Sequence, residues 1–366
     1  MRLILPFNKD HKRNGVLNTP PRLAFSRFDP RRPLRQFKGS KPVYTVFDFD
    51  AENLAERKEL SEQDCLPFRG NGRVTWINVG GLHPESVHKL CAHYDIHHLI
   101  IEDILNVGQR AKLEELGEDL YILMPMLIYN TDTARIHEEQ VSILVGRDFV
   151  ISFQENEGID AFNQVRERLR NGQQKLRSSG SEYLAYTLVD AIVDNYFEAI
   201  EQLFDRGERL EDQILEGEKK DPLTAITLLR REVMTLVRAV IPVNELMNEM
   251  VSSENPLLSR NNERYWRDVR DHALQASDYG DSLRDTIRNL RELHTSQMNT
   301  RMNEVMKVFT MVATLLAPAT VIGGIYGMNF EALPLANQAH GFWIMLSIMI
   351  VIPTLMLIWF KRKGWI

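Results

Sequence analysis

The sequence predicts an α/β domain, then a long α-helical stalk, then two C-terminal transmembrane helices. Two uncharged stretches carry this prediction: Val308–Ile325, which has eighteen residues, and Phe342–Phe360, which has nineteen. About 20 apolar residues in a helix cross the hydrocarbon core of a bilayer. The rest of the chain is charged and rich in helix-forming residues, which favours a large soluble domain tied to a membrane hairpin. The alternative is that both stretches are buried core helices of a soluble protein.

The N-terminal arm differs in charge from everything that follows it. Residues 1–41 contain eleven Lys or Arg and two acids, whereas the remaining chain has a net charge of −15. The arm is rich in proline and lacks periodicity, which predicts a disordered, solvated tail. Contact with anionic lipid and a transit peptide are the alternatives. The acidic remainder favours cations as partners and argues against nucleic acid.

Residues 43–160 alternate between strand-type and helix-type segments, which predicts an α/β domain. Gly-containing turns separate several of the apolar runs. Strands are expected at 43–47, 74–79, 120–123, 141–145 and 149–153, and helices at 83–94 and around 99–106.

Three long, charged segments with helical periodicity follow. The first runs from about Glu182 to Leu215, and the second covers about Asp221 to Val251 with an interruption near Pro242. The third is expected to be one helix from about Glu263 to Ile325, because no proline and only one glycine, Gly280, precede its apolar end. At 1.5 Å per residue, roughly sixty residues would extend about 90 Å. Two helices hinged at Gly280 are the alternative.

The flanking charges predict the orientation in the membrane. Arg301 and Lys307 precede the first stretch and Lys361 follows the second, whereas the connecting loop has neither Lys nor Arg. Positive residues remain in the cytoplasm, so both termini are expected in the cytoplasm. The two spans are expected to cross a cell (inner or plasma) membrane. The predicted parts are a basic arm (1–42), an α/β domain (43–160), a long-helix region with the stalk (161–307), a first span (308–325), an external loop (326–341), a second span (342–360) and a basic tail (361–366).

One stripe of the first span is small and polar. Two spans per chain cannot enclose a water-filled path, so a pore requires several copies around an axis; otherwise the hairpin is an anchor. Small residues also favour close helix packing without a pore. The residues at steps of three and four are Asn303, Met306, Thr310, Ala313 or Thr314, Ala317, Thr320 and Gly324.

Short motifs identify a resemblance over residues 43–366. The loop between the spans begins with Tyr326-Gly327-Met328-Asn329-Phe330, and Ile-Glu-Asp-Ile-Leu-Asn stands at 101–106. Further matching strings are Asn-Glu-Val-Met-Lys-Val at 303–308 and the basic tail at 361–366. The chain resembles the CorA family of magnesium/cobalt transporters, divalent-cation channels with a Gly-Met-Asn motif. The zinc-transporting ZntB branch tends to have Gly-Val-Asn, so Met328 favours the magnesium-type branch.

The resemblance implies a funnel-shaped homopentamer in which the first span lines the pore and the second lies outside it. Five loops with Gly327, Met328 and Asn329 would form the external mouth and selectivity filter. Mg²⁺ gives up its water reluctantly, so a ring of Asn329 carbonyls would recognise the hydrated ion without holding it too tightly. Gly327 would supply backbone freedom.

Further residues of the first span are candidates for the conduction path. Thr320 and Asn303 would be polar stations, and Met306 with Phe309 or Thr310 would form a narrow apolar neck, which gates by dewetting. Ordinary side-chain packing explains an aromatic residue at Phe309 as well as a role in gating does.

The resemblance also implies a Mg²⁺ sensor between subunits. Asp103 and Asp268 correspond to one site, and Glu102 and Asp190 to a second. A bound cation would relieve the repulsion between facing carboxylates, so high internal Mg²⁺ would hold the pore shut. Each acid taken singly also fits a solvated surface position.

These observations predict a passive, Mg²⁺-gated channel for influx of divalent cations: Mg²⁺, Co²⁺ and, as a further candidate, Ni²⁺. Mg²⁺ is expected as both transported and regulatory ion, with no organic cofactor. No phosphate-binding Gly-rich loop, nucleophile elbow or His/Cys ligand spacing occurs, so an enzyme is not expected. The alternatives are a zinc-transporting relative and a membrane-anchored helical signalling or receptor protein.

Overall fold

In the computed structural model, a mixed β-sheet lies between two layers of helices. The structure describes residues 42–156, 161–217, 221–328, 333–335 and 338–365. The seven strands lie in the order β2-β1-β3-β7-β6-β5-β4, and only β3 and β7 are parallel neighbours. The strands are β1 (Val43–Phe49), β2 (Leu54–Leu60), β3 (Val74–Gly80), β4 (Lys112–Leu116), β5 (Asp119–Asn130), β6 (Arg135–Val145) and β7 (Phe149–Gln154).

The five strands expected from the apolar runs are confirmed, but two strands were missed. β2 and β4 lie at the two edges of the sheet. Their sequences, Leu-Ala-Glu-Arg-Lys-Glu-Leu and Lys-Leu-Glu-Glu-Leu, carry too many charges to be recognised by hydrophobicity. Charged side chains are common on edge strands because they discourage pairing with other chains. Both strands form only because a neighbouring strand completes the hydrogen bonding.

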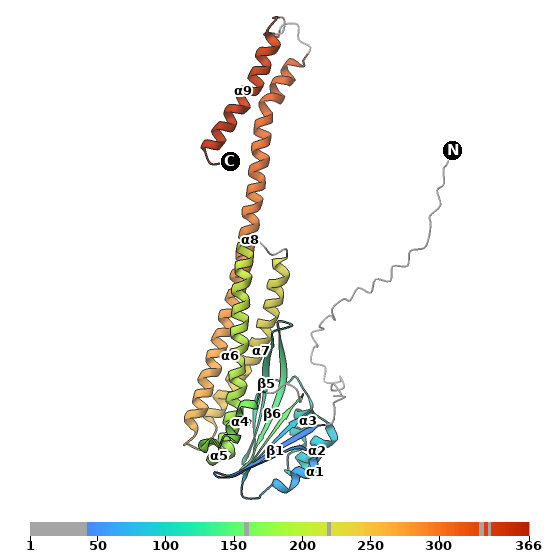
Figure 1. Ribbon diagram of the computed structural model, residues 1–366, viewed down its shortest axis with the longest axis vertical. Coiled ribbons are helices and arrows are strands. Elements are labelled where there is room, and N and C mark those ends of the chain that lie inside the picture. Colours follow the sequence, from blue (N-terminus) through green and yellow to red (C-terminus); the bar gives the residue numbers. More distant parts are fainter. Residues whose placement is uncertain (1–41, 157–160, 218–220, 329–332, 336–337, 366) are drawn as a thin grey trace, which may run out of the picture. The chain divides into compact units, whose positions relative to one another are not determined.

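Helices cover both faces of the sheet (Figure 1). On β5, Ile122 and Met124 belong to the core under the long helices, whereas Tyr121 and Leu123 belong to the core under α2 and α3. This follows from the alternation of side chains along a strand. The elements of the second layer are α1 (Glu62–Cys65), η1 (Leu66–Phe68), α2 (Pro84–His93) and α3 (His98–Leu105).

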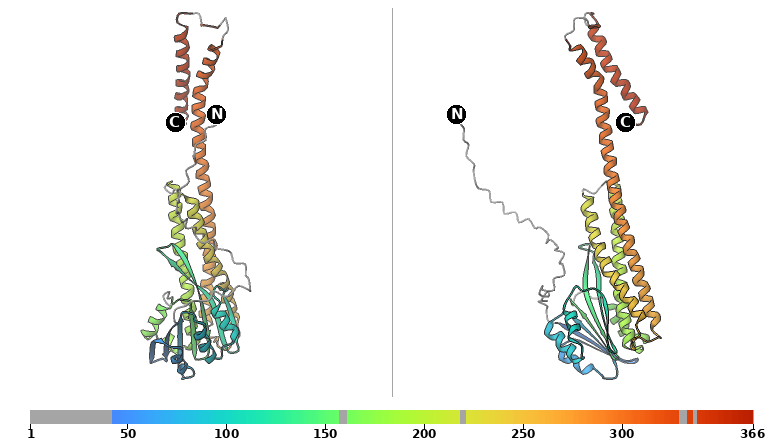
Figure 2. Two further views of the ribbon diagram at one scale, coloured as in Figure 1. Left: turned by 90° about the vertical axis from the view of Figure 1, so that its right-hand side faces the viewer. Right: turned by 180° about the vertical axis from the view of Figure 1, so that it is seen from behind.

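Three long helices pack against one another on the opposite face and lie side by side in every view (Figure 2). The helices after the sheet are α4 (Asn163–Arg170), α5 (Gln174–Ser178), α6 (Gly180–Leu215), α7 (Pro222–Ser252), α8 (Glu263–Tyr326) and α9 (Gly341–Arg362). The predicted single third helix is confirmed as α8. The alternative hinge at Gly280 is wrong: this residue is buried, and a Cβ there would lie 3.0 Å from a methyl group of Val237. Gly280 therefore allows α7 to approach α8 closely.

The predicted interruption of the second helix near Pro242 is wrong. α7 continues through Pro242 as one helix. A proline in a helix removes one backbone hydrogen bond and kinks or breaks an isolated helix. Here Val240, Val243 and Leu246 are buried on either side of it, so packing holds the helical conformation across the proline.

A buried carboxylate connects the start of α6 to the start of α8. Glu182 accepts hydrogen bonds from the Ser259 backbone N–H (3.1 Å) and hydroxyl (2.8 Å), from Asn262 Nδ2 (2.7 Å) and from Trp266 Nε1 (3.2 Å). These donors satisfy a charge that would otherwise be costly to bury. The network fixes where α8 begins relative to α6.

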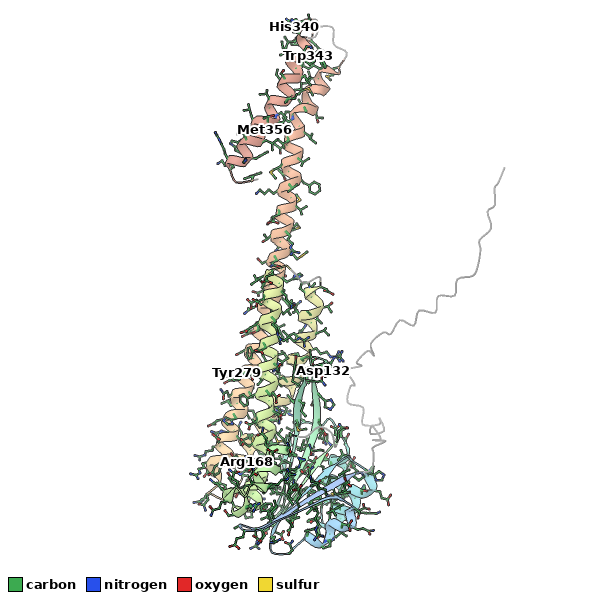
Figure 3. All side chains as sticks on the ribbon, in the orientation of Figure 1. Asp132, Arg168, Tyr279, His340, Trp343 and Met356 are labelled. Carbon is green, nitrogen blue, oxygen red and sulfur yellow. The ribbon has the colours of Figure 1, made fainter. Side chains whose placement is uncertain are left out.

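The apolar end of α8 and all of α9 are long and apolar enough to cross a membrane, judged by length and composition. The two helices contact one another. The Tyr326 hydroxyl at the end of α8 donates to the Pro334 carbonyl (2.8 Å). His340 and Trp343 lie at the loop end of α9 (Figure 3), where aromatic residues are common at a membrane interface.

One buried carboxyl in the sheet predicts a pH-dependent stability. Glu139 of β6 has no exposed surface, and one of its carboxyl oxygens has no hydrogen-bond partner among the residues that the structure describes. Burial raises the pKa of Glu139 to about 7. Because the folded pKa lies above the unfolded one, stability is highest below pH 4.5 for this group and falls as pH rises towards 7.

We expect Glu139→Gln to remove this part of the pH dependence. The amide keeps the size of the side chain and cannot ionise, so the variant should be more stable than the parent at pH 8 by about 2 kcal/mol. At pH 5 the two should differ little. The check is the difference in Tm between variant and parent across this pH range. Glu249→Gln, an exposed glutamate of α7, is the control; equal behaviour of both variants would contradict the prediction.

Candidate ion pathway and cation-binding side chains

The stripe predicted to line a pore is left uncovered by α9. On α8, Met311, Leu315 and Ile322 are half-buried and share one side of the helix, and α9 runs beside the apolar end of α8 (Figure 1). The helical repeat places the stripe roughly opposite these residues. Its exposed members are Asn303, Met306, Thr310, Ala313, Ala317, Thr320 and Gly324, whereas Thr314 is half-buried. Phe309, the other candidate for the conduction path, is also exposed. The stripe is therefore available to other copies of the chain.

The hydroxyls of this stripe bond to their own helix. Thr310 Oγ1 donates to the Met306 carbonyl (2.8 Å), and Thr320 Oγ1 donates to the Leu316 carbonyl (3.0 Å). A hydroxyl that donates in this way still has oxygen lone pairs to accept hydrogen bonds. Such oxygens suit the water shell of a cation.

At the tip of the hairpin, Gly327 caps the C-terminus of α8. Its φ is −81°, a value open to any residue, and its predicted role in bringing the loops together stays a prediction. A Cβ at this position would lie 3.1 Å from the Gly323 carbonyl oxygen, so glycine is favoured by the tight turn. Met328 is exposed. Asn329 lies outside the described residues, and its role in selectivity stays a prediction.

The first predicted regulatory acid has a cationic partner within the chain. Asp103, on α3, forms an ion pair with Lys112 of β4, with Nζ 2.5 Å from the carboxylate. The same ammonium also lies 2.6 Å from Glu114. Glu102, the neighbouring residue, is exposed.

Asp103 and Asp268 lie on different layers of the fold. α3 packs with the core on one face of the sheet, and α8 packs with the core on the other. Asp268 is exposed on α8. A cation held by both acids would therefore have to lie between two copies of the chain.

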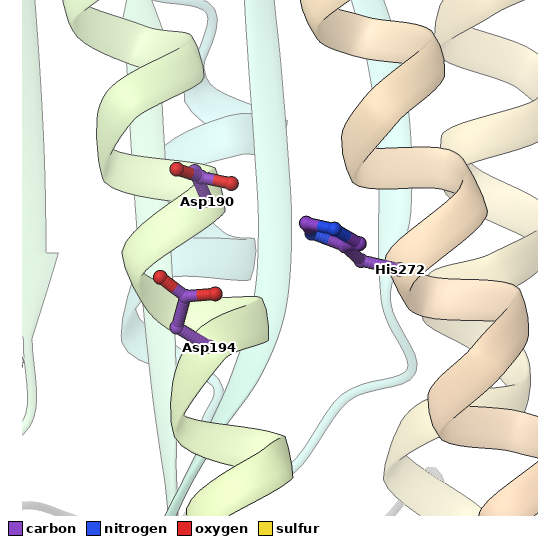
Figure 4. Close-up of side chains that lie close together, drawn as sticks. All are labelled: Asp190, Asp194 and His272. Carbon is purple, nitrogen blue, oxygen red and sulfur yellow. The ribbon is translucent and has the colours of Figure 1, made fainter.

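The other predicted acid, Asp190, belongs to a cluster within one chain. Asp190 and Asp194 on α6 face His272 on α8 (Figure 4), and ligand atoms of all three lie within 4.8 Å of one another. Asp268 lies one helical turn before His272. Burial, followed by the charge of Asp194, raises the pKa of Asp190 to about 6. Burial also raises the pKa of Asp194.

Sequence reasoning found Asp190 but missed Asp194, His272 and Lys112. The available signal was spacing: Asp190 and Asp194 are four residues apart on one helix, as are Asp268 and His272 on another. Residues four apart lie on the same helix face. That these two faces meet is a consequence of helix packing, which spacing does not reveal.

Comparison with known proteins places this geometry in a family. A family model described as "CorA-like Mg2+ transporter protein" matches residues 71–362. The chain is 36% identical over 322 residues to the cobalt/magnesium transport protein CorA of Thermotoga maritima, covering 88% of this chain and 92% of that protein. It is 21% identical over 291 residues to the zinc transport protein ZntB of Yersinia pseudotuberculosis, covering 80% and 88%. The complete structure of the CorA magnesium transporter from Methanocaldococcus jannaschii matches 88% of this chain and 98% of that chain with a TM-score of 0.73 at 24% identity, which shows the shared fold.

Proposed function

Because the chain belongs to the CorA-like Mg²⁺ transporter family, we propose that it forms a passive channel for Mg²⁺ and Co²⁺ that internal Mg²⁺ closes. Membership of the family makes the chain a divalent-cation transporter, and the family is one of transporters, not enzymes. The choice of Mg²⁺ and Co²⁺ is supported by the similarity to the Thermotoga maritima protein, which exceeds that to the zinc transporter.

The exposed stripe on α8 is the observation that carries the proposal. Two apolar helices per chain cannot surround an aqueous path, and a ring of identical chains would bring the uncovered stripes together. We infer a homopentamer in a cell membrane with both termini in the cytoplasm, the α8 segments innermost and α9 outside. Gly327, Met328 and Asn329 would then form the external mouth.

Closure by Mg²⁺ follows from charge. In a ring, Asp103 of one copy would face Asp268 of the next, and their repulsion would favour separation of the subunits. A Mg²⁺ ion between them, near Glu102 and Asp190, would stabilise the closed arrangement, because a ligand that prefers one state shifts the population towards it. Continuous α8 connects this interface to the proposed pore.

The test of this function is ion flux in reconstituted liposomes. We expect Mg²⁺ and Co²⁺ to enter when an inside-negative potential is applied, and to stop entering when Mg²⁺ is high on the side of the large domain. Zn²⁺ is measured in parallel, because preferential Zn²⁺ flux would indicate the zinc-transporting alternative. Absence of any cation flux from a correctly folded protein would favour a membrane-anchored signalling role.

Assembly is tested separately from flux. We expect the purified protein in detergent to have the mass of five chains, by light scattering or native mass spectrometry. A monodisperse monomer or dimer that retains full transport activity would contradict the pore, since too few copies of α8 would be present to enclose it.

A further inference from the structure

We propose that each chain binds a small phosphate-bearing anion in a cavity at the carboxyl ends of β3 and β7. The cavity has a volume of about 240 Å³. Polar and cationic side chains from β1, β2, β3, β7 and α4 line it: Thr45, Lys58, Asn78, Gln154, Arg166 and Arg170. The site goes beyond the proposed transport function and does not depend on it. It uses none of the acids expected to bind cations.

The first observation is the position of the cavity in the sheet. Among the described strands, only β3 and β7 are parallel neighbours. After β3 the chain continues to α2 on one face of the sheet, whereas after β7 it continues to α4 on the other face (Figure 1). Where the connections of neighbouring parallel strands leave on opposite faces, the carboxyl ends of the strands form a crevice. Open α/β sheets bind their ligands in this crevice.

The second observation is the sign of the charges around the cavity. Every charged side chain among the described residues that line it is cationic: Lys58 of β2, and Arg166 and Arg170 on α4. Glu56 accepts hydrogen bonds from Nε (2.8 Å) and Nη2 (2.9 Å) of Arg170 and lies 3.3 Å from Nζ of Lys58. These three positive charges and one negative charge sum to +2. A phosphate group, with a charge near −2, matches this sum better than a single carboxylate does.

The third observation is that both guanidinium groups lie over buried aromatic rings. The central carbon of Arg166 lies 5.8 Å from the ring centroid of Trp76, and that of Arg170 lies 5.9 Å from the ring centroid of Phe47. The two rings stack with their centroids 5.1 Å apart. Side chains held in this way lose less freedom when they bind a ligand. An arginine has five N–H donors, so pairing with one carboxylate does not prevent contact with a second anion.

The fourth observation is a buried chain of hydrogen bonds that ends at the cavity with a donor. Trp76 Nε1 can only donate, and it donates to Ser152 Oγ (2.9 Å). The Ser152 hydroxyl donates its own hydrogen to Asn78 Oδ1 (2.7 Å). Asn78 is 7% exposed and lines the cavity, and its NH₂ group is the part that is left to donate to a ligand. A buried amide donor favours an anion over a cation.

The size and the donors of the cavity limit the ligand. Pockets for drug-sized ligands have volumes of roughly 300–1,000 Å³, whereas this cavity has about 240 Å³. It therefore fits inorganic phosphate or a small phosphate ester. Both present the same charged oxygens, which an arginine binds through two parallel N–H···O bonds.

The experiment measures anion binding by the full-length protein in detergent, in phosphate-free buffer with a chelator that removes Mg²⁺. Inorganic phosphate, glycerol 3-phosphate and chloride are titrated separately by calorimetry. We expect phosphate to bind, and chloride to bind roughly 10-fold more weakly or less, because chloride cannot form paired bonds with an arginine. Tighter binding of inorganic phosphate would identify the free ion as the ligand. Tighter binding of glycerol 3-phosphate would identify a phosphate ester.

Variants of the lining residues test the site directly. We expect Arg166→Gln to weaken phosphate binding about 10- to 100-fold, the effect of losing a hydrogen bond to a charged group. Arg168→Gln is the matched control on the same helix, because Arg168 Nε donates to Gln173 (2.6 Å); this variant should bind phosphate like the parent. Asn78→Asp keeps the size of the side chain but replaces the donor with a negative charge, so it should abolish phosphate binding.

Three results would overturn the proposal: phosphate binding by the parent that is no tighter than chloride binding, unchanged phosphate binding by a folded Arg166→Gln protein, and an equal loss of binding in Arg166→Gln and Arg168→Gln. If Arg166→Gln does not fold, Lys58→Gln tests the same site from an exposed position on β2, with the adjacent Arg57→Gln as its control. We expect Lys58→Gln to weaken phosphate binding about 5-fold, as loss of an exposed charge pair does. Equal binding by these two variants would also reject the site.

Discussion

Replacing Asn329 by alanine is expected to reduce cation uptake to the background of protein-free liposomes. The proposed filter is a ring of side-chain amides whose carbonyl oxygens accept hydrogen bonds from the water shell of the ion. Alanine removes every acceptor of this ring, and a hydrated Mg²⁺ would then lose its partners at the mouth. Because Mg²⁺ dehydrates reluctantly, loss of these groups leaves no alternative way to enter.

The measurement is Mg²⁺ flux together with the mass of the purified oligomer. Asn337→Ala makes the same substitution elsewhere in the loop and should transport like the parent. Gly327→Ala is expected to impair uptake as well, because its Cβ would lie 3.1 Å from the Gly323 carbonyl oxygen and would disturb the tip. Normal uptake by a correctly assembled Asn329→Ala protein would show that the filter lies elsewhere.

Replacing Asp268 or Asp103 by alanine is expected to abolish inhibition by internal Mg²⁺. Each change removes one of the two carboxylates that would share the ion and also removes their mutual repulsion. Currents should then persist at internal Mg²⁺ concentrations that silence the parent. Asp278→Ala, an exposed acid on the same helix, is the matched control and should remain fully inhibited.

Limited proteolysis gives an independent readout of the same site. Mg²⁺ that binds only the closed state stabilises it by mass action, so the large domain of the parent should be protected as Mg²⁺ rises. The Asp268→Ala protein should gain less protection. Identical inhibition curves and identical protection in parent and variant would place the sensor outside this pair of acids.

The ion pair with Lys112 leads to a further prediction about Mg²⁺ binding at Asp103. Its ammonium pairs with the Asp103 carboxylate, so a Mg²⁺ ion at Asp103 has to compete with it. We expect Lys112→Met to shift inhibition to lower Mg²⁺ concentrations, opposite in direction to Asp103→Ala. Titration of Mg²⁺ inhibition in the two variants checks the direction in which the inhibitory Mg²⁺ concentration shifts.

The sequence by itself determined the two long apolar helical segments, the five central strands and the single long α8, because the hydrophobic periodicity and the absence of proline indicate the local conformation directly. The edge strands β2 and β4 were not predicted, because pairing with a neighbouring strand stabilises them and their own composition does not indicate a strand. The continuity of α7 through Pro242 likewise depended on packing against α6 and α8.

Only the tertiary structure decided which acids meet. Residue spacing placed Asp190 with Asp194 and Asp268 with His272, each pair on its own helix face. Their convergence required α6 and α8 to pack with these faces together, and no local pattern encodes the rotation of one helix against another. The same applies to Asp103, whose partner Lys112 is brought to it by the pairing of an edge strand. Local periodicity specifies an element, whereas the environment of a charged side chain depends on residues far away in the sequence.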